Sequence, residues 1–158
     1  MPASEVVSAT FVRKQRLGSI KLAAPYSPQY TGGGEGALLD GIRGRQDFRL
    51  GGWQGYEGTD LEAVVDLDSA RTISAVSLGC LQDNNSWIFF PSSVEFSFSD
   101  DGATWRDAVR VDPGISPKET ALVIKDVTAT VAALRALFVR VRATNIGTCP
   151  PWHRGAGG

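Results

Sequence analysis

The chain has 158 residues, a length that fits one domain built around one core. It carries 16 Lys and Arg against 17 Asp and Glu, and a net charge of −1 offers no broad basic field for a phosphate backbone, so we expect no nucleic-acid partner. No stretch approaches the ~18 consecutive apolar residues that span a bilayer, and residues 1–10 lack the features of a signal peptide, so we expect no membrane partner. Cys80 and Cys149 could form one disulfide or remain two unpaired thiols, and they match no C-x-x-C metal or redox pattern.

Glycine is concentrated near the start of the expected domain. Residues 1–18 should form a linker or a first strand, and the domain should occupy residues 19–158. Ten of the 18 glycines fall between Gly32 and Gly58. A stretch of this length without strand or helix periodicity, inside a compact domain, is usually either disordered or functional. Because it also contains aromatic and charged side chains, we expect an ordered loop with a functional role.

Short segments rich in β-branched and aromatic residues follow, separated by turn residues, and they predict an antiparallel all-β domain. Two strands are expected over residues 61–67 and 72–81, with a link at Asp68-Ser69. Residues 93–99 alternate apolar and polar side chains, so this strand should bury one face and expose the other to water.

The second half of the chain predicts further strands. The Asp101-Gly102 turn indicates a hairpin with a return strand over residues 104–111, and residues 137–142 alternate as another strand. Residues 121–127 are expected to be a strand, whereas the Ala-rich residues 128–135 would also suit a helix and are left open. The expected architecture is a β-sandwich with long loops at its ends.

Side chains suited to catalysis are scarce. His153 is the only histidine and no G-x-S-x-G motif is present, so we expect no Ser-His-Asp hydrolase. Residues 32–37 fit G-x-G-x-x-A, but no apolar strand precedes them and no βαβ unit follows, which argues against a dinucleotide site. Asp47 and Asp83 could form a glycosidase pair, although ordinary hydrogen-bonding loop carboxylates are the simpler interpretation.

Three predicted loops combine tryptophan with hydrogen-bonding side chains. Sugars are bound by stacking their C–H faces on aromatic rings while amides, carboxylates and guanidinium groups hold their hydroxyls, so this mixture favours a carbohydrate site, although protein recognition uses similar residues. The alternative is that Trp53, Trp87 and Trp152 close the ends of the sandwich as part of its core. The three groups are Trp53-Gln54-Gly55-Tyr56, Asp83-Asn84-Asn85-Ser86-Trp87 and Trp152-His153.

The order of several motifs is that of a known module. The motifs are Leu39-Asp40-Gly41, a Gly-rich loop, Val65-Asp66-Leu67, the hairpin from Phe96 to Trp105, and Phe138-Val139-Arg140-Val141. In this order the chain resembles the F5/8 type C (discoidin) domain, also classed as carbohydrate-binding module family 32. The resemblance covers roughly residues 19–153. It implies a galactose-binding-like jelly-roll β-sandwich of about eight antiparallel strands.

A finer resemblance concerns three loop segments, which are similar to the version of this domain attached to bacterial β-N-acetylhexosaminidases of glycoside hydrolase family 20. It implies a non-catalytic module of a longer, secreted or periplasmic glycan-degrading enzyme, beside the catalytic domain of the same polypeptide. The implied partners are glycans of the galactose, GalNAc or GlcNAc type. The absent signal peptide agrees with a part of a longer polypeptide. The segments are Asp47-Phe48-Arg49, Trp53 to Gly58 and Trp87 to Pro91.

Eight residues are expected to form the sugar site. Trp53, Tyr56 and Trp87 should stack on a sugar ring, and a second set should bind its hydroxyls or acetamido group. The alternative function is a structural accessory domain of a hexosaminidase that binds no ligand of its own. A third function, adhesion to a membrane or a protein, would need apolar side chains at the loop tips. Residues 87–90 are the candidate, but Pro91 and the strand that follows suggest that they are buried. The second set is Asp47, Arg49, Gln54, Asn85 and His153.

The resemblance also implies a structural calcium ion beneath the binding loops. Asp40 matches the Asp ligand of the family, and oxygen donors suit this cation. Arg45 stands where a hydroxyl is usual, and no acidic residue follows His153, so the match to the calcium site is partial. Related domains continue into a closing strand where this chain has residues 155–158, and an open strand edge there would suit pairing with a second copy.

Overall fold

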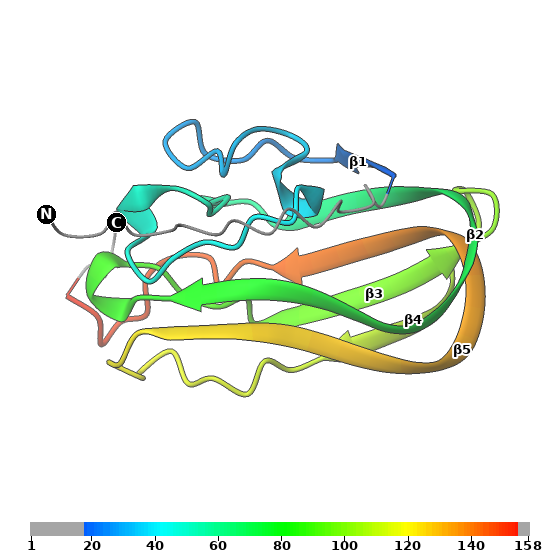
Figure 1. Ribbon diagram of the computed structural model, residues 1–158. Helices are drawn as coiled ribbons and strands as arrows, with labels where there is room; N and C mark the ends of the chain where they lie inside the picture. The colour runs from blue at the N-terminus through cyan, green and yellow to red at the C-terminus, as the bar shows by residue number, and fades with distance from the viewer. Residues whose placement is uncertain (1–17, 155–158) are drawn as a thin grey trace, which may run out of the picture.

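The computed structural model describes residues 18–154, which form β-strands joined by long loops and three short 3-10 turns (Figure 1). Residues 1–17 of the expected linker or first strand (residues 1–18), and the end of the chain at residues 155–158, lie outside this part. Within it, no helix is long and apolar enough to cross a membrane. The strands are β1 (Ser19–Leu22), β2 (Leu61–Gln82), β3 (Ser93–Ser99), β4 (Arg106–Val111) and β5 (Val123–Thr144); the turns are η1 (Ala37–Leu39), η2 (Phe48–Leu50) and η3 (Asn84–Ser86).

All pairings between strands are antiparallel, in the order β1-β2-β5-β3-β4. The strands β2 and β5 are each 22 residues long and pair with each other along most of their length. Figure 1 shows both bending at the same end of the molecule, so that the second half of β2 and the first half of β5 form a second layer. The predicted all-β sandwich is confirmed, and its described part has five strands because two of them serve both layers.

The course of β2 and β5 corrects one strand prediction and resolves a segment that the sequence leaves open. Residues 61–67 and 72–81 belong to one continuous strand, whose register shifts between Asp66 and Arg71. Asp68 takes the left-handed conformation at the bend, with φ 66°, and its N–H donates to Asp66 Oδ1 at 2.9 Å. The open segment 128–135 is β-strand within β5, because pairing of Ala129 with Val76 and burial against the core outweigh the helix propensity of alanine.

The prediction of a half-exposed strand over residues 93–99 is wrong. In β3 the serines Ser93, Ser97 and Ser99 are buried together with the phenylalanines between them. The strand lies between β5 and β4, and Arg140 covers its polar face: Arg140 Nε donates to Ser97 Oγ at 3.2 Å. The Arg140 guanidinium in turn lies 4.5 Å from the ring centroid of Trp105. The alternation of polar and apolar residues therefore predicted the strand correctly, but it did not predict that Arg140 covers the polar face.

A buried polar side chain fixes the end of the core that carries η3. Gln82, the last residue of β2, is 1% exposed. Its Nε2 donates to the Ser116 carbonyl oxygen at 2.9 Å, and its Oε1 accepts from the Phe90 N–H at 3.2 Å. Gln82 thus ties the segment after η3 and the loop between β4 and β5 to the end of β2, which holds the turn in place.

Candidate functional site

The η3 turn projects an aromatic ring from the end of the sandwich. Asp83 and Ile88 pair as an isolated bridge, and the tight turn between them places Trp87 in the left-handed conformation with φ 61°. Its N–H donates to the Asn84 carbonyl oxygen at 3.1 Å, and its side chain is 55% exposed. A bulky residue in this conformation is uncommon and costs energy, and such positions are concentrated at functional sites.

His153 lies beneath the turn as a support. It is 6% exposed, and its ring makes edge contacts with Trp87, Phe89 and Trp152 at centroid distances of 6.2, 5.4 and 5.8 Å. His153 Nε2 lies 2.8 Å from the Asn84 carbonyl oxygen, and because a carbonyl only accepts, this nitrogen carries the hydrogen. The ring that we expected to bind sugar hydroxyls is thus enclosed by the aromatic side chains that it holds.

A hollow of about 340 Å³ lies beside the exposed ring. It is lined by Trp87, Asn85, Ser86 and Arg154. Arg154 comes from the C-terminal segment and contacts the turn through a hydrogen bond of 3.4 Å from Nη2 to the Asn85 carbonyl oxygen. Two residues of the sequence-predicted site, Asn85 and Trp87, therefore lie together at this hollow. We call it the tryptophan hollow.

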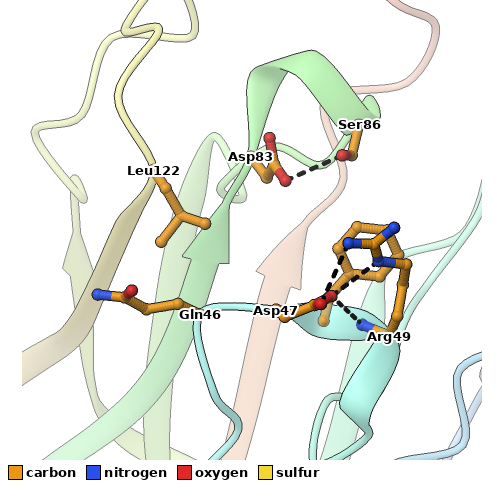
Figure 2. A pocket seen from close by; sticks show the side chains of 7 residues that line it. Gln46, Asp47, Arg49, Asp83, Ser86 and Leu122 are labelled. Atoms are coloured by element: carbon orange, nitrogen blue, oxygen red, sulfur yellow. Dashed lines mark hydrogen bonds and ion pairs between the residues drawn. The ribbon is translucent and has the colours of Figure 1, made fainter.

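A second hollow, of about 400 Å³, lies on the other side of Ser86 and is called the aspartate hollow (Figure 2). Figure 2 shows the side chains of Asp83, Leu122 and Asp47 around it. The Ser86 hydroxyl donates to Asp83 Oδ2 at 2.9 Å. The complete lining is Gln46, Asp47, Phe48, Arg49, Asp83, Ser86 and Leu122.

Asp47 and Arg49, both predicted site residues, form a closed pair on η2. Asp47 caps this turn, because its Oδ1 accepts the Arg49 N–H at 3.0 Å. The Arg49 guanidinium donates to both oxygens, at 2.9 and 3.1 Å. These hydrogen bonds from the side chain and then the backbone of Arg49 lower the pKa of Asp47. A glycosidase acid needs a raised pKa, so Asp47 is not suited to be the general acid of a pair with Asp83.

Three other predicted residues face inward and brace the Gly-rich loop. The Trp53 indole N–H donates to the Arg45 carbonyl oxygen at 2.7 Å, and its ring lies so close to Gly44 that a Cβ there would be 2.2 Å from a ring carbon. Gln54 Nε2 donates to the Gly34 carbonyl oxygen at 3.0 Å, and Gln54 Oε1 accepts from the Tyr56 hydroxyl at 2.6 Å. Burial raises the pKa of Tyr56 to about 12. The described loop is ordered by these contacts.

The structure thus brings Asp47, Arg49, Asn85 and Trp87 to the surface around the two hollows. Sequence reasoning did not name the other lining residues as sugar contacts. Ser86 stands within the quoted loop motif, so a signal for it was present. Leu122 and Arg154 reach the hollows from segments far along the chain, and no local pattern marks them.

Calcium at Asp40 stays a prediction. Asp40 follows η1 at the surface, and its Oδ1 accepts the Ile42 N–H at 2.7 Å. In residues 18–154, no three His, Cys, Asp or Glu side chains gather to hold a metal. Calcium takes six to eight oxygen ligands, and the family's hydroxyl is replaced by Arg45, so the side-chain donors here fit the ion poorly.

Neither cysteine is in a disulfide, and burial raises the pKa of the Cys80 thiol to about 12.

Comparisons with known proteins identify the architecture. The model of the F5/8 type C domain matches residues 22–157. No curated protein sequence matches. Several solved structures share the fold, and it is the galactose-binding-like jelly roll that the sequence predicted.

Three of these structures illustrate the likeness. A fucose binding module of Streptococcus pneumoniae has a TM-score of 0.54 at 12% identity, over 82% of this chain and 85% of the other. A chitosan-binding module from a chitosanase/glucanase of Paenibacillus sp. IK-5 has 0.50 at 19% identity, over 80% and 81%. The family 32 module of Clostridium perfringens NanJ, solved with galactose, has 0.50 at 15% identity, over 80% and 82%.

Proposed function

The chain belongs to the F5/8 type C domain family, and we propose that it is a non-catalytic carbohydrate-binding module whose site is the end of the sandwich around η3. The observation that carries this proposal is the exposed indole of Trp87 beside the tryptophan hollow. An aromatic face next to amide, hydroxyl and guanidinium groups is the combination that a sugar ring needs. The fold neighbours named as fucose-, chitosan- and galactose-binding modules add support.

In this proposal Trp87 stacks on the apolar face of the sugar. The Asn85 side chain, the Ser86 hydroxyl and the Arg154 guanidinium lie around the ring and bind its hydroxyls. His153 positions Trp87 from below and does not touch the ligand, since it is enclosed. Trp53, Gln54 and Tyr56 hold the neighbouring loop rather than the sugar.

Isothermal titration with galactose, N-acetylglucosamine and N-acetylgalactosamine tests the proposal. We expect roughly millimolar affinity for at least one of them, because a small open site recovers little free energy. Trp87→Ala should weaken binding at least about tenfold, since it removes the stacking surface.

Trp152→Ala is the matched control. Trp152 is also exposed, at 43%, and also contacts His153, but it does not line either hollow. Its substitution should leave affinity unchanged. Absence of heat with every sugar, or equal losses in the two variants, would contradict the proposed site and favour a structural accessory domain.

We further propose that the module acts within a longer, secreted glycan-degrading enzyme. The support is the resemblance of residues 47–49, 53–58 and 87–91 to the domain of family 20 β-N-acetylhexosaminidases. The chitosan-binding neighbour also derives from a glycan-degrading enzyme. Calcium is a separate expectation from the family resemblance, which the side-chain donors around Asp40 support poorly. Repeating the titration with a chelator tests it: lost affinity supports a bound ion, and unchanged affinity argues against a role for one in binding.

A further inference from the structure

We infer that the site takes a glycan of at least two sugar residues, with one ring in the tryptophan hollow and the next in the aspartate hollow. This inference rests on the proposed carbohydrate-binding function. It adds the length of the ligand and a second set of contact residues.

The two hollows are neighbours. Ser86 lines both of them, so the hollows meet at this residue of η3. Their volumes, about 340 and 400 Å³, each lie near the lower end of the ~300–1,000 Å³ typical of small-molecule sites. Two similar small hollows that share a wall suit two adjacent rings better than one large ligand.

The lining of the aspartate hollow combines apolar surface with hydrogen-bonding groups, as a sugar site does. Phe48 and Leu122 supply apolar surface, and Leu122 is 39% exposed. The polar groups of Gln46, Asp47 and Asp83 stand around the same space. An apolar surface bordered by hydrogen-bonding groups matches a ring with C–H faces and hydroxyl edges.

The charges in this hollow disfavour an acidic ring. Two carboxylates, Asp47 and Asp83, face one guanidinium, that of Arg49. Arg49 already donates to both oxygens of Asp47. Asp83 accepts a hydrogen bond from the Ser86 hydroxyl, and it forms no salt bridge with another described residue. The hollow therefore carries an excess of one negative charge, which accepts hydrogen bonds from hydroxyls and repels an acidic sugar.

The test compares a monosaccharide with its dimer by isothermal titration, using galactose with α-1,4-galactobiose and N-acetylglucosamine with its β-1,4-linked dimer. In each pair whose monomer binds, we expect the dimer to bind at least about tenfold more tightly. Asp83→Asn and Leu122→Ala should each weaken binding of the dimer more than binding of the monomer, and so reduce this gain. Either variant alone suffices if the other fails to fold, as judged by its circular dichroism spectrum.

Asp107→Asn serves as the matched control, because this exposed aspartate lies near the start of β4, at the other end of the sandwich. It should change neither affinity. Equal affinities for monomer and dimer overturn the inference while leaving the proposed function intact. A dimer gain that survives both Asp83→Asn and Leu122→Ala also overturns it. Absence of binding by every monomer and dimer overturns both the inference and the proposed function.

Discussion

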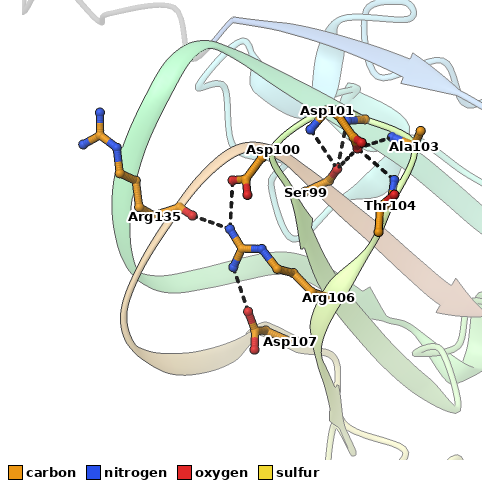
Figure 3. Close-up of polar contacts among 9 residues, drawn as sticks. Ser99, Asp100, Asp101, Ala103, Thr104, Arg106, Asp107 and Arg135 are labelled. Atoms are coloured by element: carbon orange, nitrogen blue, oxygen red, sulfur yellow. Dashed lines mark hydrogen bonds and ion pairs between the residues drawn. The ribbon is translucent and has the colours of Figure 1, made fainter.

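The two ends of the sandwich use the same kinds of side chain in opposite ways. At the end away from η3, the polar side chains of the β3–β4 turn form hydrogen bonds with one another and with the backbone of the turn (Figure 3). Asp101 Oδ1 accepts from the N–H groups of Ala103 and Thr104, each at 2.8 Å, and from the Ser99 hydroxyl at 2.9 Å. These hydrogen bonds lower the pKa of Asp101 to about 2.

An arginine completes this closed turn. Arg106 donates to Asp100 Oδ1 at 2.9 Å, to Asp107 Oδ2 at 2.7 Å and to the Arg135 carbonyl oxygen at 2.6 Å. The tryptophan of this end, Trp105, lies beneath the Arg140 guanidinium. Aspartate, arginine and tryptophan are all present here, yet they contact one another and line neither of the two hollows.

At the η3 end the corresponding groups border open space. Trp87 is exposed, Asp83 accepts a single hydroxyl, and Asn85 and Arg154 line a hollow. Residue types alone therefore do not identify a binding site. The η3 end differs because the backbone of η3 directs these groups outward, while buried Gln82 and His153 hold the turn in place.

The largest effect is expected from removing that buried support. Gln82→Leu leaves the Phe90 N–H and the Ser116 carbonyl without their partner, and we expect the free energy of unfolding to fall by about 2 kcal/mol. Urea denaturation measures the loss. Gln46→Leu makes the same change at an exposed position and should stay within about 0.5 kcal/mol of the parent. Equal stabilities for the two variants would show that Gln82 does not hold the η3 end.

A smaller effect is expected at Trp87, where the backbone conformation opposes the side chain. Trp87→Gly should be more stable than Trp87→Ala by about 1 kcal/mol, because glycine tolerates a φ of 61° without the steric cost. Thermal denaturation of the two variants measures this difference. Both should lose sugar binding equally. If the alanine variant is as stable as the glycine variant, the left-handed turn carries no strain.

The smallest effect is expected in acid, at the closed end. The pKa of Asp101 is about 2 in the folded protein, below the ~3.9 of an unfolded aspartate. Its contribution to stability is therefore present above pH ~4 and is lost as the pH falls toward 2. The melting temperature of Asp101→Asn should fall less steeply over this interval than that of the parent. Parallel pH profiles for the two proteins would contradict the proposed role of this carboxylate.

Local patterns in the sequence predicted some of these features and missed others for identifiable reasons. Alternation and turn residues are local signals, so the antiparallel β class could be predicted. The bends of β2 and β5 could not, because they depend on pairing between distant segments. Asp47 and Trp87 were predicted from their loops and do border the hollows. Trp53 had the same local signature but turns inward, since its indole N–H binds the Arg45 carbonyl oxygen.

Nuclear magnetic resonance of the four tryptophan indole N–H groups tests the central claim most directly. Galactose, N-acetylglucosamine and N-acetylgalactosamine are added in turn, and each signal is assigned by a single Trp→Phe variant. We expect the Trp87 signal to shift on saturation, while those of Trp53, held inside its loop, and Trp105, beneath Arg140, stay in place. A shift of Trp53 or Trp105 with Trp87 unmoved would contradict the account.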